Sequence, residues 1–241
     1  MLGLGNSITS GGYTPFALTS VSSLALWLKN NVGLSQATGK VQQWNDSSGN
    51  DNHVLQSSES NQATVSGGGL DFERDNSDHY DLTSSIAIAD QGGFCLAIVV
   101  TLETADSDNS IFSDTGNELI KFAATNKFKL NMNNPSNETA TLQYDSNSFP
   151  VSQKFLLLLN RSAGATARYK LFKNGTELTL DTDNSTGTEN SNGFDIDTLG
   201  SKSGSSDFFD GIMHEVAFWS KGLSATEIAD VNSYLKEIHG L

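Results

Sequence analysis

The chain has 241 residues, which fits one large all-β domain. Its 28 acidic residues against 14 Lys and Arg give a formal net charge of −14, which argues against nucleic-acid binding, because a phosphate backbone requires clustered basic side chains. Cys95 is the only cysteine, so neither an intrachain disulfide nor a cysteine-based metal cage can form.

Residues 1–22 are rich in Gly, Ser and Thr, show no regular apolar period, and predict an extended N-terminal arm. The arm is either a frayed terminus or a segment that becomes ordered against a partner subunit. Residues 1–10 have no basic residue before an apolar run, so we expect no signal peptide and synthesis in the cytoplasm. No apolar run approaches the ~18 residues that span a bilayer, so we expect no membrane segment.

From residue 23 to residue 241 the pattern predicts one domain built from short strands bounded by turn residues. The predicted strands are 24–28, 39–44, 70–72, 94–102, 118–123, 127–132, 139–144, 154–160, 167–172, 177–180, 194–199 and 208–218. The polar stretches 57–62, 104–110, 133–138 and 181–193 are predicted loops of the same domain.

Two runs, 94–100 and 155–159, are apolar at successive positions, which is typical of strands covered on both faces. By contrast, 127–132 alternates between polar and apolar residues and predicts a half-buried strand. Asn174-Gly175 between two strand patterns is a strong hairpin signal, because a type I′ turn requires positive φ at both central positions.

The segment 224–239 predicts the one helix. Ser224 and Glu227 have the spacing of a capping box, in which each side chain bonds a free backbone N–H of the first turn. Apolar residues recur at helical spacing and predict a stripe that packs on the sandwich, and Gly240 ends the helix. The stripe consists of Ile228, Val231, Leu235 and Ile238.

Pairs of acidic residues were considered as catalytic groups, because glycosidases use two carboxylates about 5 to 10 Å apart. Two acidic side chains on one face of a strand are separated by one residue in the sequence, in the pattern acid-x-acid. The pairs are Asp106/Asp108, Asp181/Asp183 and Asp195/Asp197. The first two lie in polar stretches and favour solvated loops, whereas the third lies in a strand pattern but fits an outward edge face equally well. We therefore expect no enzymatic activity.

Calcium is the metal for which the sequence offers ligands. The candidate oxygen ligands are Asp181, Asp183, Asn184 and Glu189, but their spacing fails the EF-hand pattern. An ordinary acidic loop is the alternative interpretation. The four histidines are dispersed and predict single hydrogen-bonded or surface side chains.

Other chemical signatures are weak. The chain has neither a Gly-x-Ser-x-Gly elbow nor a phosphate loop, and Cys95 lies in an apolar strand pattern. The three Trp residues are expected in core or semi-buried positions. Tyr13, Phe149 and Phe208 lie in loop-like contexts and are the aromatic ligand candidates.

Several phrases together resemble the concanavalin A-like lectin/glucanase superfamily, in particular its laminin-G-like domains. They are LALWL at 24–28, WNDSSGNDNH at 44–53, LDF at 70–72, LFKNG at 171–175, FDGIMHEVAFW at 209–219 and LSATEI at 223–228. The resemblance implies an all-β fold, a two-sheet antiparallel jelly-roll β-sandwich. Its motifs are mainly structural: Asp46, Ser47, Gly49 and Asn50 are expected to form a turn. The catalytic strand of the glucanases, E-x-D-x-x-E, is missing.

The N-terminal phrase MLGLGNSIT also resembles virion structural proteins of tailed phages, especially those of marine cyanobacteria. This resemblance implies a capsid decoration, collar or fibre subunit, oligomeric in the particle, whose arm 1–22 contacts other virion subunits. The alternative is a carbohydrate-binding module for surface glycans, with or without calcium. We expect a non-enzymatic virion protein made in the host cytoplasm.

Overall fold

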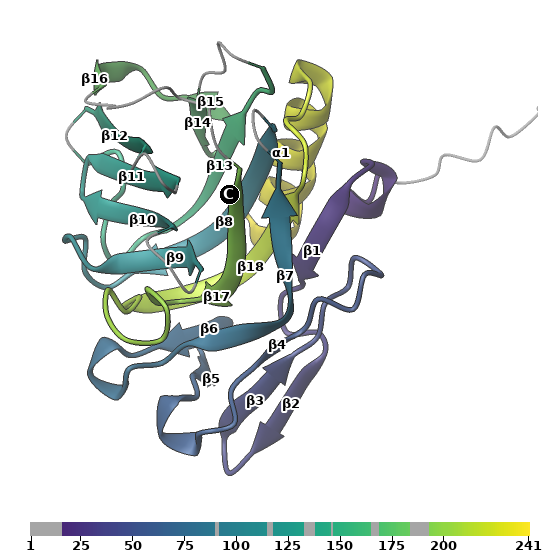
Figure 1. Cartoon of the computed structure of the whole chain (residues 1–241), viewed down its shortest axis with the longest axis vertical. Helices are drawn as coiled ribbons and strands as arrows, with labels where there is room; N and C mark the ends of the chain where they lie inside the picture. The colour runs from purple at the N-terminus through teal and green to yellow at the C-terminus, as the bar shows by residue number, and fades with distance from the viewer. Residues whose placement is uncertain are drawn as a thin grey trace, which may run out of the picture.

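The computed structural model describes residues 16–89, 92–114, 118–132, 138–145, 147–164, 169–183 and 193–241. In these residues the strands pair antiparallel and form two layers, with one α-helix behind the rear layer (Figure 1). The expected all-β sandwich with a C-terminal helix is confirmed. No helix among the described residues has the length and apolar character needed to cross a bilayer.

The front sheet follows the pairing order β4, β7, β17, β9, β10, β11, β12, β16. Its strands are β4 (Val54–Leu55), β7 (Tyr80–Ile88), β17 (Phe194–Leu199), β9 (Asn109–Ser113), β10 (Leu119–Ala124), β11 (Lys127–Met132), β12 (Glu138–Tyr144) and β16 (Leu180–Asp183). Figure 1 shows this sheet from its outer side.

The back sheet follows the order β1, β18, β8, β13, β14, β15. Its strands are β1 (Leu24–Leu28), β18 (Gly211–Trp219), β8 (Phe94–Leu102), β13 (Lys154–Arg161), β14 (Tyr169–Lys173) and β15 (Thr176–Glu177). Four further strands, β2 (Leu34–Ala37), β3 (Lys40–Trp44), β5 (Thr64–Ser66) and β6 (Gly69–Phe72), link the sheets, since β6 pairs with β18 and β3 pairs with β4.

Two apolar layers explain why β8 is apolar at every position from Phe94 to Val100. Phe94, Leu96 and Ile98 point into the core between the two sheets, and Cys95 and Ala97 point to the opposite side. That opposite side packs against α1 (Ala225–His239), so β8 is covered on both faces as predicted. Cys95 is fully buried there.

The structure confirms the predicted caps at both ends of α1. Ser224 Oγ accepts from the Glu227 backbone N–H, the Glu227 side chain accepts from the Ser224 N–H, and Gly240 closes the helix in the left-handed conformation. The predicted stripe is wrong at its last member, because Ile238 is 47% exposed and His239 takes the buried position. Steps of four residues from Val231 carry the buried face to position 239 rather than 238.

The structure describes residues 16–22 of the predicted arm. Leu18 and Val21 are buried in the apolar layer behind the back sheet, and η1 (Leu18–Ser20) is a single 3-10 turn. The Phe16 ring lies edge-on to Tyr234 of α1 with centroids 5.8 Å apart. These residues therefore pack on the domain, and residues 1–15 lie outside the described part.

Some predicted boundaries are wrong. The single strand expected at 177–180 is divided between β15 and β16, and β9 and β16 extend into the loops predicted at 104–110 and 181–193. The patterns also missed β2, β4, β5, β7 and β9. β4 is too short to show a period, and β7 carries Thr, Ser and Ala on its exposed face, which resembles loop composition. Two further 3-10 turns are η2 (Glu59–Asn61) and η3 (Arg74–Asn76).

Candidate functional site

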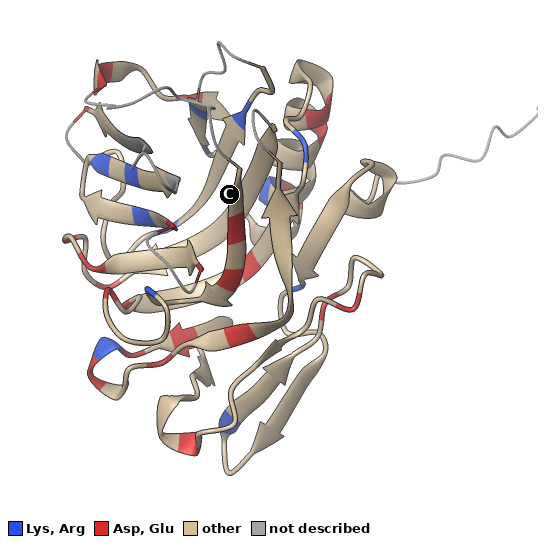
Figure 2. Cartoon of the chain, viewed as in Figure 1, with Lys and Arg blue, Asp and Glu red and all other residues tan. Residues whose placement is uncertain are grey.

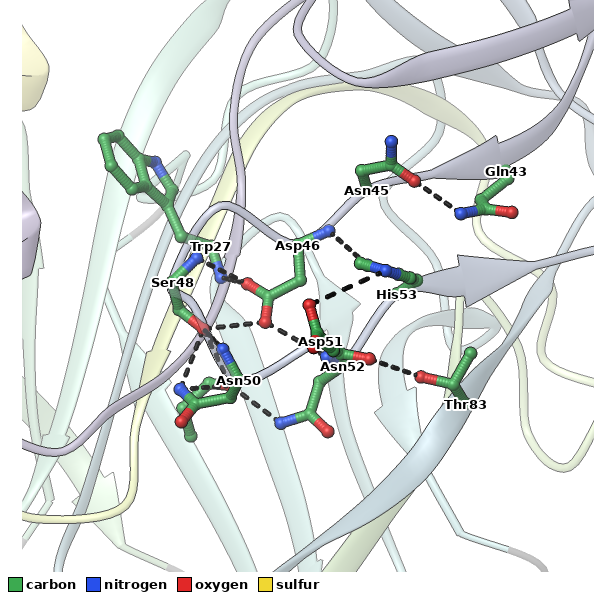
Figure 3. Close-up of polar contacts among 11 residues, drawn as sticks. Trp27, Gln43, Asn45, Asp46, Ser48, Asn50, Asp51, Asn52, His53 and Thr83 are labelled. Carbon is green, nitrogen blue, oxygen red and sulfur yellow. Dashed lines mark hydrogen bonds and ion pairs between the residues drawn. The ribbon is translucent and has the colours of Figure 1, made fainter.

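The Asp46 turn is the most densely hydrogen-bonded part of the sequence motif (Figure 3). Asp46 Oδ1 accepts from the Trp27 and Ser48 N–H groups, both at 2.8 Å. Asp46 Oδ2 accepts from Ser48 Oγ at 2.7 Å and from Asn52 N at 3.1 Å. His53 Nδ1 accepts from Asp46 N at 3.0 Å. Four donors occupy the Asp46 carboxylate, so it is not available as a metal or substrate ligand.

The amides of the same turn bind the first strand of the back sheet. Asn50 Nδ2 donates to Leu24 O at 2.7 Å, and Asn52 Nδ2 donates to Ala25 O at 2.9 Å. The predicted turn is confirmed, and its side chains close the fold around β1 rather than forming a site (Figure 3).

The pair Asp195 and Asp197 lies on β17 and alternates with the core residues Phe194 and Ile196, which places the pair on the outer face of the front sheet. Figure 2 shows the acidic positions of this strand in red. Asp195 is exposed and Asp197 is half-buried. Glu118 contacts the backbone of the same strand, since Glu118 Oε2 accepts from Asp195 N at 2.7 Å. No local pattern predicts this contact, because Glu118 and Asp195 are 77 residues apart in the chain and only the fold brings them together.

Of the two pairs predicted in loops, one carboxylate has a strong partner. Arg74 Nη1 and Nη2 donate to Asp106 Oδ2 and Oδ1 at 2.7 and 2.9 Å. This bidentate hydrogen bonding to Arg74 holds the pKa of Asp106 below its usual value. Asp106 is therefore held in an ion pair, while Asp108 is half-buried.

The predicted calcium ligands are only partly described. Asp181 and Asp183 are exposed on β16, and Asn184 and Glu189 lie outside the described residues. The calcium site remains a prediction.

A different group of carboxylates lies near the Arg74–Asp106 ion pair. Ligand oxygens of Glu73, Glu103 and Asp210 lie within 4.8 Å of one another. Desolvation first, and then the charge of Asp71, raises the pKa of both Glu73 and Glu103. Glu73 and Glu103 are exposed, and oxygen ligands of this kind suit a hard cation. The sequence missed this cluster because three separate elements contribute to it.

The histidines have individual partners, but two of them lie close together. His239 Nε2 contacts Glu215 Oε2 at 2.8 Å in a buried pair, and the rings of His214 and His239 are 6.3 Å apart. His214 lies between Gly68 O and Thr101 Oγ1, each at 3.0 Å. Burial lowers the pKa of His214.

The aromatic residues singled out from the sequence have different outcomes in the structure. The three Trp residues are buried as expected, and Phe149 is a fully buried core residue rather than a ligand candidate. Phe208 is half-buried with its ring centroid 5.9 Å from that of His79. Tyr13 lies outside the described residues.

Three hollows surround the β14–β15 hairpin at the edge of the back sheet. The first hollow has a volume of about 330 Å³ and lies between the hairpin and the start of α1; it is lined by Asn160, Ser162, Lys170, Phe172, Glu177, Leu223, Ala225 and Ile228. The second hollow, about 370 Å³, lies further along α1 and is lined by Asn174, Gly175, Thr176, Ala229, Asn232, Ser233 and Lys236. The third hollow, about 350 Å³, faces the front sheet and is lined by Tyr144, Tyr169, Lys170, Leu171, Glu177, Leu178, Thr179 and Leu180.

The predicted turn fixes the hairpin. Asn174 and Gly175 have φ values of 49° and 83°, the left-handed backbone that this turn requires. Asn174 Oδ1 accepts from Leu156 N at 2.8 Å, and Asn174 N donates to Leu156 O at 2.9 Å. These two bonds join the turn to β13 and hold the hairpin in a defined position beside α1.

The first hollow combines an aromatic ring with charged groups. Phe172 is half-buried, and the Lys170 Nζ to Glu177 Oε1 distance is 3.1 Å, with both side chains about half exposed. On the other wall, Asn160 Oδ1 accepts from Leu223 N at 2.7 Å, and Asn160 Nδ2 donates to Leu223 O at 3.2 Å. Hydrogen bonds therefore join Asn160 to Leu223 on one wall, while the Lys170–Glu177 ion pair is exposed to solvent and accessible to a ligand. Local sequence patterns gave no signal for this hollow.

Comparison with known proteins gives a family and a set of similar folds. The sequence model of the concanavalin A-like lectin/glucanases superfamily matches residues 74–229. No curated protein sequence matches.

Among solved structures, the binding domain of Paraclostridial Mosquitocidal Protein 1 aligns with a TM-score of 0.62 and 11% identity, covering 90% of this chain and 53% of that chain. The botulinum neurotoxin serotype D ligand binding domain in complex with N-acetylneuraminic acid aligns with a TM-score of 0.58 and 15% identity, covering 90% and 52%. Trypanosoma rangeli sialidase aligns with a TM-score of 0.54 and 13% identity, covering 90% and 33%. At these identities the similarity is one of fold, and the chain spans only part of each of these proteins.

Proposed function

Because the chain belongs to the concanavalin A-like lectin/glucanase superfamily, we propose that it is a carbohydrate-binding domain whose site is the first hollow, between α1 and the β14–β15 hairpin. The observation that carries the proposal is a half-buried Phe172 ring beside the exposed Lys170–Glu177 pair. A sugar ring has an apolar face that packs on an aromatic ring and hydroxyls that bond charged groups. The volume of about 330 Å³ is at the lower end of the range for ligand pockets.

The overall charge favours a neutral glycan. The chain carries a formal charge of −14, and this field repels anionic ligands such as carboxylated sugars. N-acetylneuraminic acid is bound by the botulinum neurotoxin D domain, and we propose that this chain differs in preferring uncharged sugars.

We propose binding without catalysis. Hydrolysis of a glycosidic bond uses two carboxylates that flank the bond. The first hollow has one carboxylate, Glu177, and Lys170 pairs with it. The acidic residues of β17 lie on the other sheet and line none of the three hollows.

We also propose that binding in the hollow requires no calcium, since calcium takes six to eight oxygen ligands and the lining offers a single carboxylate. Asp181, Asp183, Asn184 and Glu189 remain the candidates for a calcium-assisted mode. Binding measured in calcium and in a chelator separates the two modes: the hollow predicts equal signals, and loss of signal in the chelator supports the calcium-assisted mode.

The experiment is a glycan array probed with the wild-type chain and two variants. Ala225 lines the first hollow and is exposed, so Ala225→Trp fills the hollow. The neighbouring Thr226 is exposed and does not line it, which makes Thr226→Trp a matched control on the same helix turn. We expect neutral glycans to bind the wild type and the control, and Ala225→Trp to lose them. Binding of no glycan by the wild type would refute the proposal.

As a second candidate we propose the virion structural role, in which residues of the arm 1–22 contact neighbouring subunits. The burial of Leu18 and Val21 within the domain sharpens its test, because a deletion must stop before residue 16 to leave the fold intact. If residues 2–15 anchor the subunit, their deletion abolishes incorporation into particles and changes the oligomeric state measured by light scattering. Unchanged incorporation would remove the anchoring role.

A further inference from the structure

We propose that the bound glycan is an extended neutral oligosaccharide that runs along α1 from the first hollow into the second. This inference rests on the proposed function and adds to it the chain length and the direction of the ligand.

The two hollows share the same two walls. Ala225 and Ile228 line the first hollow, and Ala229, Asn232 and Lys236 line the second. Positions three, four, seven and eight apart lie on one side of a helix, so both sets belong to the side of α1 that faces the hairpin. Their mean positions differ by about six residues, or roughly 9 Å along the helix axis. This spacing suits a short run of linked sugars rather than a single ring.

The opposite wall is continuous as well. β14 contributes Lys170 and Phe172 to the first hollow, and the turn that follows contributes Asn174 and Gly175 to the second. A Cβ placed on Gly175 would lie 3.7 Å from Lys236 Cδ, so the tip of the hairpin lies against α1 at the second hollow. The ligand path therefore follows the hairpin from its strands to its tip.

The lining changes along this path from an aromatic ring to polar groups, and an oligosaccharide has apolar faces and hydroxyls for both. The first hollow offers the Phe172 ring for one sugar face, whereas the second is lined by hydroxyl and amide groups and one amine. Thr176 and Ser233 are exposed there, and the lining contains no carboxylate. Hydroxyl and amide groups both donate to and accept from sugar hydroxyls, and the Lys236 amine donates to them.

Asn232 adds a specific acceptor to the second hollow. It is 4% exposed, and its Nδ2 donates to Ile228 O at 2.9 Å, which fixes which end of the amide is the oxygen. Asn232 Oδ1 has no hydrogen-bond partner among the described residues. An unsatisfied buried acceptor is costly, and we infer that a sugar hydroxyl inserted beside Asn232 supplies the missing donor to this buried oxygen.

The test is calorimetric titration with ladders of cello-, manno-, malto- and chito-oligosaccharides of one to six sugars. For the ladder that binds, we expect affinity to rise with length and then level off once both hollows are filled. Ala229→Trp fills the second hollow, and we expect it to weaken the longer sugars about tenfold, as the loss of one or two hydrogen bonds would. The same variant should leave the single sugar within about twofold. Thr226→Trp should match the wild type for every length.

The outcomes separate this inference from the proposed function. If sugars bind with an affinity independent of length, or if Ala229→Trp leaves the longer sugars unchanged, the extended path is wrong and the single site stands. If no sugar of any ladder binds, both are wrong. Thermal unfolding of each variant checks folding. If Ala229→Trp fails to fold, Ser233→Trp fills the same hollow from another exposed helix position, and the same outcomes apply.

Discussion

Glu215 joins three elements of the fold through its carboxylate. Trp27 Nε1 of β1 donates to Oε1 at 2.7 Å, and His239 Nε2 of α1 contacts Oε2 at 2.8 Å. Glu215 itself lies on β18 and is 1% exposed. A buried charge is tolerated only when it is paired, so these contacts are what allow a carboxylate under the helix.

Removing one partner tests this role. His239→Ala leaves the Glu215 carboxylate with the Trp27 donor alone, and we expect the free energy of unfolding to fall by about 3 kcal/mol. Chemical denaturation provides the measurement. The exposed pair Lys170–Glu177 provides the control, since Lys170→Ala should cost less than about 1 kcal/mol. If His239→Ala lowers the free energy of unfolding as little as Lys170→Ala does, the buried pair does not stabilise the fold in this way.

Cys95 is predicted to be unreactive in the folded chain. Desolvation, with a smaller contribution from the charge of Glu227, raises the pKa of the Cys95 thiol, so the reactive thiolate is scarce at neutral pH. We expect no colour change with a disulfide reagent at pH 8 in the native protein and one equivalent after denaturation. Rapid labelling of the native protein would mean that the layer behind the back sheet opens readily.

At the scale of elements, the start of α1 depends on a network around Glu227. Lys221 Nζ donates to Oε1 at 2.7 Å, and Ser224 N donates to Oε2 at 2.8 Å. The Lys221 hydrogen bond first, and then the Ser224 backbone bond, lowers the pKa of Glu227 to about 2. The same end of the helix borders the first hollow, so the cap also positions the proposed site.

This network predicts a pH dependence. Because the folded pKa of Glu227 lies below its ordinary value of 4.5, the ionised side chain stabilises the fold fully above pH 4.5, and the stabilisation is lost as the pH falls toward 2. Unfolding curves between pH 6 and pH 2 should therefore fall more steeply for the wild type than for Glu227→Gln, which keeps the capping geometry. Parallel curves for the two proteins would show that the ionised Glu227 carboxylate does not contribute to the stability of the fold.

Elements with a strong local signal were predictable from sequence. The capping residues and periodic stripe located α1, and the unbroken apolar runs located β8 and β13. Elements whose stability comes from the partner strand were missed, as β7 shows with its exposed Thr and Ser residues. The last turn of α1 was assigned wrongly at Ile238 because the buried place is held by a polar residue, His239, whose partner lies on a distant strand.

At the scale of the whole molecule, the chain forms three layers: the front sheet, the back sheet and α1 with residues 16–22. The core between the sheets and the layer under α1 share the back sheet, which explains its apolar strands. Figure 2 shows acidic and basic positions separated along the front sheet, with Lys residues on β10 and β11 and Asp residues on β17. That charged face is the alternative place for a ligand.

The proposed site could be predicted from sequence only in part. The hairpin turn at Asn174-Gly175 and the helix are visible as local patterns, but their juxtaposition is not. Lys170 and Ala225 line one hollow although 55 residues separate them along the chain. Only the packing of α1 on the back sheet brings them together, and that packing depends on long-range contacts such as Glu215 with His239.

The most direct test of the central claim is a map of NMR chemical-shift changes on adding the neutral glycan that binds best on the array. The account predicts changes at residues 170–177 and 225–236, with little change on the front sheet. Changes centred instead on Lys127, Lys129 and Asp195, with α1 and the hairpin unaffected, would contradict it.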